Sequence, residues 1–477
     1  MKRALVFVLT AALFACKPVG PDYQLPQQAV VNAPAANGRF ASADSATANA
    51  PLPPQWWRLY QAPDLDRLIE AAFVANTDLR VAEANLERSR ALVTEARAGQ
   101  EVGVAFNFDP NYGQLSAEQY LQPRIIPPDG LYDLGLSASY ELDLFGRIRR
   151  AIEAANAEDQ AIEATRDLVR VTVAAQTAAA YVDLCGAGAQ LVTLRHTLAL
   201  QEDRLAYLTR LIAAGRGTRL ETTREQGLIA QVRADVPSLE ARQRNALYLL
   251  ATLTGRPPAA FDTTLQSCTA IPALTQPIPV GDGAALLRRR PDVRAVEREL
   301  AAATARIGVA MADLYPRITL GVGVGSTGLL TDILDPLTNR FAVGPNISWE
   351  LNHSATRARI EQAEAVSRAV LARFDGVVLK ALRDVESAMN VYSRALARDV
   401  SVRAARDRAA QTLADTRALE LAGRTGSLDT LDAERTLAAT ESAVTASRAQ
   451  IAADQIALFL ALGGGWETRP GPGFGSN

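Results

Sequence analysis

The stretch AGRGTRLE at Ala214–Glu221 returns in the second half of the chain as AGRTGSLD at Ala422–Asp429. Other segments recur in the same order, with offsets that differ by only a few residues: YELD at 140–143 matches WELN at 349–352, and NTDLR at 76–80 matches RPDVR at 290–294. Self-similarity at a nearly fixed separation indicates that one structural unit has been built twice. We therefore predict an internal duplication, with a first repeat at 61–270 and a second repeat at 271–463.

Each repeat contains two segments in which apolar and polar residues alternate. In residues 131–144 the even positions from Tyr132 to Leu144 are apolar, whereas the odd positions from Asp133 onward are Asp, Gly, Ser and Glu. A period of two predicts a β-strand with one apolar and one polar face. The predicted strands lie at about 102–109, 131–144, 317–325 and 340–351, and the Pro- and Gly-containing segments between them are predicted to be hairpin loops.

After its second strand, each repeat continues into a long segment rich in Ala, Arg, Glu, Gln and Leu, which are strong helix formers. Long helices are therefore predicted at 147–253 and 356–462. Each segment is expected to break at the Gly of the repeated motif, and the first also at Gly186-Ala187-Gly188. A run of roughly 40 helical residues spans on the order of 55 Å, which is longer than a compact core needs.

The N-terminus reads as an export signal at 1–15, since Lys2 and Arg3 precede an apolar run too short to span a bilayer as a permanent helix. The run ends in Leu-Phe-Ala-Cys, which predicts cleavage and acylation at Cys16; ordinary cleavage nearby is the alternative. Lys17, in place of the Asp typical of inner-membrane retention, favours the outer membrane. Residues 19–54 are rich in Ala, Pro, Asn and Ser and have no periodicity, so an extended strap is predicted at 16–60.

No later segment reads as apolar for long enough to be a transmembrane helix, so the strands are expected to cross the membrane. Four tilted strands cannot close a barrel, and open sheet edges are not tolerated in hydrocarbon. Two chains would give a barrel filled by its own side chains, whereas three would leave a lumen that suits the Gly, Ser, Thr, Asn and Asp face. The predicted fold is thus an α+β membrane protein: a trimeric, 12-stranded outer-membrane β-barrel with four strands per chain, continued by a long α-helical barrel in the periplasm.

Composition and cysteine use restrict the function further. The net charge of −2 gives no indication of a nucleic-acid partner. There is no Gly-rich phosphate loop and no metal-like spacing of His or Cys, so we expect neither a cofactor, nor a metal, nor an enzyme. Cys185 and Cys268 remain once Cys16 is removed, and in an oxidising compartment they form either a disulfide or two buried thiols.

A series of motifs makes the sequence similar to a known family. These motifs are Cys16 followed by VGPDY at 19–23, ELDLFGR at 141–147, RRPDV at 289–293, the two Ala-Gly stretches, LDTLDAER at 428–435 and ALGGGW at 461–466. In this order and spacing they resemble the TolC-like outer-membrane efflux factors, in the acylated OprM-like branch that serves resistance-nodulation-division pumps. The resemblance covers nearly the whole mature chain.

The resemblance implies a passive exit duct for drugs or other small toxic compounds. It implies a homotrimer anchored in outer-membrane lipid, an equatorial belt that includes 256–279 and the C-terminal tail at 464–477, and helix tips that dock on a periplasmic adaptor (membrane fusion) protein joined to an inner-membrane pump. The expected docking residues are Ala214, Gly215, Leu220, Ala422 and Gly423. A duct for type I protein secretion or heavy-metal efflux is the alternative in the same fold, and a periplasmic coiled-coil scaffold is opposed by the strands.

The second Ala-Gly stretch is the expected periplasmic gate, formed by Leu428, Asp429, Asp432 and Arg435 on one helical stripe. Three chains would place a ring of carboxylates on one axis, closed by packing of Leu428 and by ion pairs with Arg435. Asp429 aligns with Glu221 of the first repeat and can equally cap its helix, whereas Asp432 aligns with Arg224 and has no such role. The tyrosine and arginine that lock the best-known family member are replaced here by Glu420 and Thr425.

Overall fold

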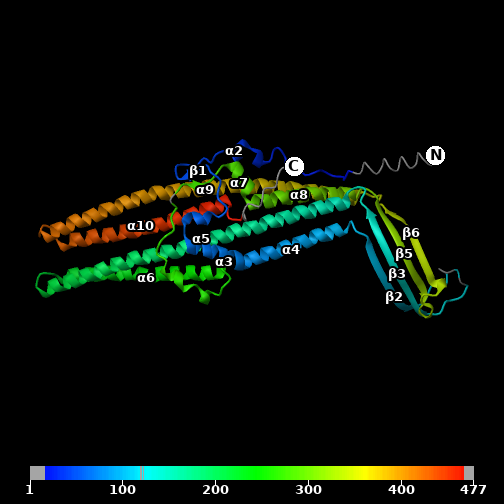
Figure 1. The fold of residues 1–477 in the computed structure, drawn as a ribbon, viewed down its shortest axis with the longest axis horizontal. Coiled ribbons are helices and arrows are strands. Elements are labelled where there is room, and N and C mark those ends of the chain that lie inside the picture. The colour runs from blue at the N-terminus through cyan, green and yellow to red at the C-terminus, as the bar shows by residue number, and fades with distance from the viewer. Residues whose placement is uncertain (1–16, 119–120, 122, 275, 467–477) are drawn as a thin grey trace. The chain divides into compact units, whose positions relative to one another are not determined.

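The computed structural model describes residues 17–466 except 119–120, 122 and 275. The described chain divides into two compact units, and each takes segments from both repeats. Unit 1 comprises residues up to 26, 86–162 and 296–374; unit 2 comprises 27–85, 163–295 and 375 onward. Two helices, α5 (Arg147–Ala213) and α9 (Ser354–Leu421), pass from the first unit into the second (Figure 1).

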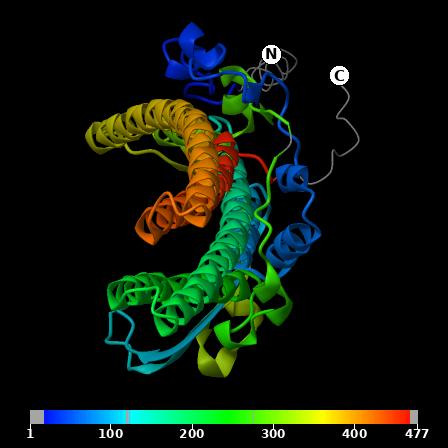
Figure 2. The ribbon, with the colours of Figure 1, turned by 90° about the vertical axis from the view of Figure 1, so that its left-hand side faces the viewer.

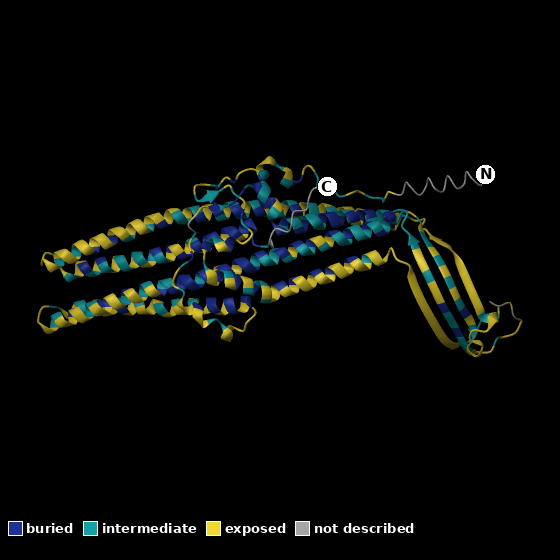
Figure 3. Cartoon of the chain, viewed as in Figure 1, coloured by how far each residue is buried: buried dark blue, intermediate teal, exposed yellow. Residues whose placement is uncertain are grey.

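Unit 1 contains an antiparallel four-stranded sheet with the order β2-β3-β5-β6. The strands are β2 (Gly103–Gly113), β3 (Asp129–Leu142), β5 (Arg317–Leu329) and β6 (Asn339–Ser348). The register aligns apolar residues in rows across one face, for example Phe106, Leu136, Val324 and Phe341. The two outer strands are exposed along nearly their whole length (Figure 3). The sheet therefore has one apolar face and two open edges.

All four predicted strands are present, with shifted ends. The strand β2 continues past the predicted end through Pro110, which an edge strand tolerates because one side of its backbone has no partner. The strand β3 stops at Leu142 because the next residue, Asp143, caps the start of α5: its carboxylate accepts the backbone N–H groups of Ile148 and Arg149 at 3.0 and 2.9 Å. Glu141 meanwhile binds Arg147 through both carboxylate oxygens.

The remaining part of unit 1 joins the start of the strap to the helices α4 (Thr77–Ala98), α5 and α8 (Pro291–Ala312). Arg150 of α5 is 3% exposed and binds the strap through the carbonyls of Val19 and Gly20 and the carboxylate of Asp22. Gly20 has a φ of +90°, and a Cβ at that position would lie 2.5 Å from the backbone of Gly308. The VGPDY motif thus connects the start of the strap to α5 and α8.

Unit 2 consists mainly of four long helices: most of α5, α6 (Arg219–Leu253), most of α9 and α10 (Ser427–Leu462). Figure 2 shows them following one another as α9, α10, α5 and α6 in an open arc. Ion pairs connect neighbours in this order, from Arg417 to Glu434, from Glu434 to Arg204, and from Arg195 to Glu240. A concave wall of helices, rather than a closed bundle, is what a segment of a tube requires.

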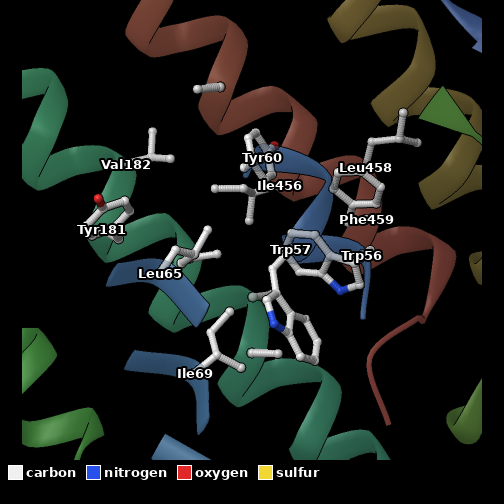
Figure 4. Close-up of a cluster of buried hydrophobic side chains, with 14 of the residues drawn as sticks. Trp56, Trp57, Tyr60, Leu65, Ile69, Tyr181, Val182, Ile456, Leu458 and Phe459 are labelled. Atoms are coloured by element: carbon white, nitrogen blue, oxygen red, sulfur yellow. The ribbon is translucent and has the colours of Figure 1, made fainter. Parts of the chain in front are cut away.

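The core of unit 2 lies where the strap meets the helices. Trp56 is 0% exposed and stacks on Phe459 of α10 with ring centroids 4.5 Å apart, and Trp57 and Tyr60 pack beside it (Figure 4). The described strap residues continue from the short η1 (Val30–Asn32) and α2 (Pro34–Asn37) to η2 (Trp56–Tyr60), which precedes α3 (Pro63–Ala75). Near them β1 (Thr47–Ala48) pairs in parallel with β4 (Ile278–Pro279) before α7 (Gly283–Arg289). This packing anchors the strap in unit 2.

The expected helix break at Gly186-Ala187-Gly188 was wrong, because α5 runs through it without interruption. These glycines provide space instead of a turn. A Cβ on Gly186 would lie 3.0 Å from Cβ of Ala449, and one on Gly188 would lie 2.1 Å from the carbonyl oxygen of Cys268. The helix accepts the glycines because α10 and the Cys268 segment approach its backbone closely there.

We also expected no later segment to be apolar for long enough to be a membrane helix, and in its length and composition one helix contradicts this. Among the described residues one helix, α5, contains an 18-residue window that passes this test, and 61% of the window is buried inside the structure. Ala174, Ala175 and Ala178 of α5 belong to the core of unit 2. Packing against other helices therefore accounts for the apolar character of α5.

Candidate functional site

Two similar loops end the helical hairpins of unit 2. The first tip loop, Ala214–Thr218, connects α5 to α6, and the second tip loop, Ala422–Gly426, connects α9 to α10. Gly215 and Gly423 have φ values of +72° and +67°, and a Cβ on either would meet nothing within 4 Å. Each glycine closes its helix in the left-handed conformation that glycine adopts without strain.

The expected docking residues are all exposed in one protomer: Ala214, Gly215, Leu220, Ala422 and Gly423. Among the larger side chains beside them, Leu220 is 56% exposed, Leu421 is 89% exposed and Leu428 is 47% exposed. Small residues and exposed leucines at the end of a hairpin make a surface that another helical protein can pack against. Each tip loop thus presents small exposed residues beside exposed leucines.

The helix starts that follow the two loops are stabilised in related ways. In the first, Thr218 and Glu221 form a capping box, and the Glu221 carboxylate accepts the Thr218 N–H at 2.8 Å. In the second, the hydroxyl of Thr425 donates to Asp429. Asp429 thus lies in the first turn of α10, but in the described chain its carboxylate binds a side chain that precedes the helix and no backbone N–H, so it does not repeat the cap that Glu221 forms. Glu221 also accepts the hydroxyl of Ser427, which links the two tips, and this bond is the main reason why its pKa lies below the usual value.

The other expected gate residues are exposed to solvent in the isolated protomer. Asp432 and Arg435 lie on the exposed surface of α10. In the part of the chain that the structure describes, Arg435 forms no ion pair with Asp429 or Asp432. One chain therefore does not build the expected Arg435 lock by itself.

A contact that sequence reasoning missed joins the two hairpins. Arg204 of α5 donates to Glu434 of α10 at 3.0 Å and to the carbonyl of Ser427 at 2.9 Å, and its guanidinium lies 4.0 Å from Glu420 of α9. Arg417 of α9 reaches the same Glu434 oxygen at 2.8 Å. Arg204 and Glu434 are 230 positions apart, so no local pattern reveals their pairing.

Glu225 of α6 is the second feature that sequence reasoning missed. Glu225 is 0% exposed, and neither of its carboxylate oxygens has a hydrogen-bond partner among the described residues. Burial raises its pKa to about 7, the nearby Glu434 adds to the rise, and Arg204 opposes it. The repeat did contain a signal, because Glu225 aligns with Ala433, a buried residue of α10. A carboxyl group thus occupies a position that the second repeat fills with a methyl group.

The cysteines lie away from the tips. Cys185 and Cys268 form a disulfide with Cα atoms 4.8 Å apart, and this bond ties the segment before β4 to the middle of α5. Beside it is a cavity of about 720 Å³ lined by α5, α9, α10 and residues 269–274. The expected acylation site, Cys16, lies outside the described residues.

Comparison with known proteins matches most of the chain to one family. Residues 68–256 and 284–464 match the model described as outer membrane efflux protein. The pyoverdine export outer membrane protein OpmQ of Pseudomonas putida is 31% identical, over 96% of both chains. The cation efflux system protein CusC of Escherichia coli O157:H7 is 27% identical, over 98% of this chain and 99% of its own. The solved outer-membrane channel OprN has a TM-score of 0.85 and 33% identity, covering 94% of this chain and 99% of that one.

Proposed function

This chain belongs to the outer membrane efflux protein family, and on that premise we propose that three copies of it pool their strands into the outer-membrane exit duct of a tripartite efflux pump. The open sheet of unit 1 carries the proposal. Four strands with two exposed edges and one apolar face cannot remain unpaired in lipid, and three copies supply twelve strands, enough to enclose water. The open arc of helices in unit 2 fits the same symmetry, since each chain then contributes one part of a tube wall.

The proposed partners are a periplasmic adaptor and an inner-membrane pump of the resistance-nodulation-division type. The exposed glycines of the two tip loops and the exposed leucines of the adjoining helix ends support adaptor docking there. The Cys16 acylation site and the GGGW segment at 463–466 support the pump type, because both belong to the motifs shared with the branch that serves such pumps.

We assign the gate of the duct to the start of α10. With three chains around one axis, Asp432 from each chain forms an acidic ring, and Leu428 packs against its symmetry mates. Arg435 of each chain pairs with a carboxylate of a neighbouring copy, because it has no such partner within its own chain among the described residues. Asp429 remains at its helix start, bound by Thr425.

The proposed cargo is a small toxic organic compound. Curated relatives are named for pyoverdine export, solvent efflux and cation efflux at similar levels of identity, so relationship alone does not select the cargo. The relative named for cation efflux makes a heavy-metal duct the second candidate. Both candidates use the same passive channel, and the pump chooses the cargo.

Accumulation of a fluorescent dye in cells that lack the gene tests the function. Wild-type protein should restore efflux, whereas Ala422→Arg, which places a large charge on the second tip loop, should not. The matched variant Ala372→Arg changes an exposed alanine of α9 in unit 1 and should restore efflux. Trimers that assemble normally and restore efflux with Ala422→Arg would contradict docking at this loop.

A further inference from the structure

A network of polar side chains crosses all four strands of the sheet. Arg340 of β6 donates from Nη2 to Asp133 of β3 at 2.6 Å and from Nε to Thr327 of β5 at 2.8 Å. The Thr327 hydroxyl donates to the second Asp133 oxygen at 3.0 Å, and Asn107 of β2 donates its amide to Asp133 at 3.2 Å. One carboxylate thus receives donors from the three other strands of the sheet.

Two glycines lie on the sheet directly under this network. Gly135 and Gly325 face each other in the β3–β5 register, and Arg340 is the partner of Gly325 in the β5–β6 register. A Cβ on Gly325 would lie 3.3 Å from Cζ of Arg340, and one on Gly135 would lie 2.5 Å from Oδ1 of Asn107 and 3.6 Å from Nη2 of Arg340. The missing side chains let the guanidinium lie flat across the sheet rather than project from it.

The network lies on the face opposite the apolar rows. Asp133 and Gly135 alternate along β3 with Leu134 and Leu136, and Leu136 belongs to the row of Phe106, Val324 and Phe341. Side chains alternate between the two faces of a strand, so if the apolar rows contact lipid, the network faces the lumen. Asp133 and Arg340 are near the hairpin loops, at the strand ends remote in the chain from the helices.

We propose that Asp133 and Arg340 form a charge-balanced girdle in the outer part of the pore and keep this part of the pore from selecting ions by charge. The proposal rests on the proposed function, because it requires the polar face to line a water-filled duct. Three copies place three such pairs around the lumen, where each guanidinium neutralises one carboxylate and is held against the wall. The girdle therefore adds little net charge to the pore and lets cargo of either charge pass. Loss of one member leaves its partner unbalanced on the wall of the pore, where a fixed charge attracts ions of one sign and repels those of the other.

Reversal potentials in planar bilayers under a salt gradient test the girdle. Arg340→Gln should shift selectivity toward cations, and Asp133→Asn should shift it toward anions. The double variant should return close to the wild-type value, and Arg340→Lys, which keeps the charge, should shift little. Opposite shifts that cancel are the signature of balanced charges facing water. Conducting trimers in which neither single variant shifts the reversal potential, or in which both shift it in the same direction, would overturn the proposal.

Two cysteine variants test which face of the sheet lines the lumen without removing a charge. Ser137 is exposed on the same face of β3, one alternation further along than Gly135. Ser137→Cys should react with a charged, water-soluble thiol reagent and lose conductance, whereas Leu136→Cys on the apolar face should keep its conductance. Reaction at Leu136→Cys with loss of current and none at Ser137→Cys would reverse the assignment of the faces. A protein that forms no channel in any variant, wild type included, would instead contradict the proposed function itself.

Discussion

Arg204 holds the two hairpins of one chain together, and Glu225 is buried near it. Arg204 connects α5 with α9 and α10, and Glu225 is buried close enough for both Arg204 and Glu434 to act on its pKa. A raised pKa means that the folded tip favours the protonated carboxyl. Stability therefore falls as the pH rises from the ordinary Glu value toward about 7, and the penalty is fully present above that pH.

Replacing Glu225 by Gln should remove this penalty. The amide has nearly the same shape but cannot ionise, so Glu225→Gln should raise the Tm of the detergent-solubilised protein above pH 7 and have little effect near pH 4.5. The control is Glu240→Gln on the same helix, where the carboxylate is exposed and paired with Arg195. A Tm difference between wild type and Glu225→Gln that is the same at both pH values would show that Glu225 does not titrate in the folded tip.

Asp432 is exposed on α10, where the proposed acidic ring would form. Like charges held close together attract multivalent cations, so Asp432→Asn should weaken cation selectivity and block by multivalent cations in single-channel recordings. Asp407→Asn, which changes an exposed aspartate paired with Arg406 on α9, should leave both unchanged. Normal selectivity and block in Asp432→Asn would place the constriction elsewhere.

The residues of the tip differ in how far the sequence could predict them. The place of Asp429 in the first turn of α10 was recognisable because the repeat aligns it with Glu221, although in the described chain its carboxylate binds the Thr425 hydroxyl and no backbone N–H. Arg204 was not, because its partners are on another hairpin and only folding brings them together. The buried position of Glu225 became interpretable only once Ala433 was seen to be buried at the equivalent place.

At the scale of elements, periodicity predicted which segments are strands and helices better than where they end. All four strands follow the period-two pattern, whereas their ends depend on caps and turns such as Asp143. The glycines at 186 and 188 led to the wrong prediction of a helix break. A glycine in a helix can mark either a break or a place where another segment approaches closely, and only the packing partner distinguishes the two.

Gly188→Ala tests that interpretation. The new methyl group would collide with the carbonyl of Cys268, so it should destabilise the protein by about 1–3 kcal/mol and slow formation of the Cys185–Cys268 disulfide. Gly227→Ala is the matched control on α6, where nothing lies within 4 Å, and it should stabilise by about 0.5–1 kcal/mol. Denaturant unfolding and non-reducing peptide mapping measure the two effects. Equal stability of the two variants would mean that Gly188 does not lie against the Cys268 segment.

At the scale of the whole molecule, the predicted acylation of Cys16 can be tested directly. We expect metabolic labelling with palmitate to tag the wild-type protein in the outer-membrane fraction, because the apolar run ends at Cys16. Cys16→Ser should lose the label but still form channels, since the strands supply the membrane span. Label that persists in Cys16→Ser would place the lipid elsewhere.

One chain is an incomplete channel, and three chains close its open sheet. Native mass spectrometry of the protein extracted gently from the outer membrane tests this most directly. The exposed edges of β2 and β6 predict a particle with the mass of three acylated chains, and no stable species with one or two. A stable monomer that retains its full strand content by circular dichroism would contradict the account.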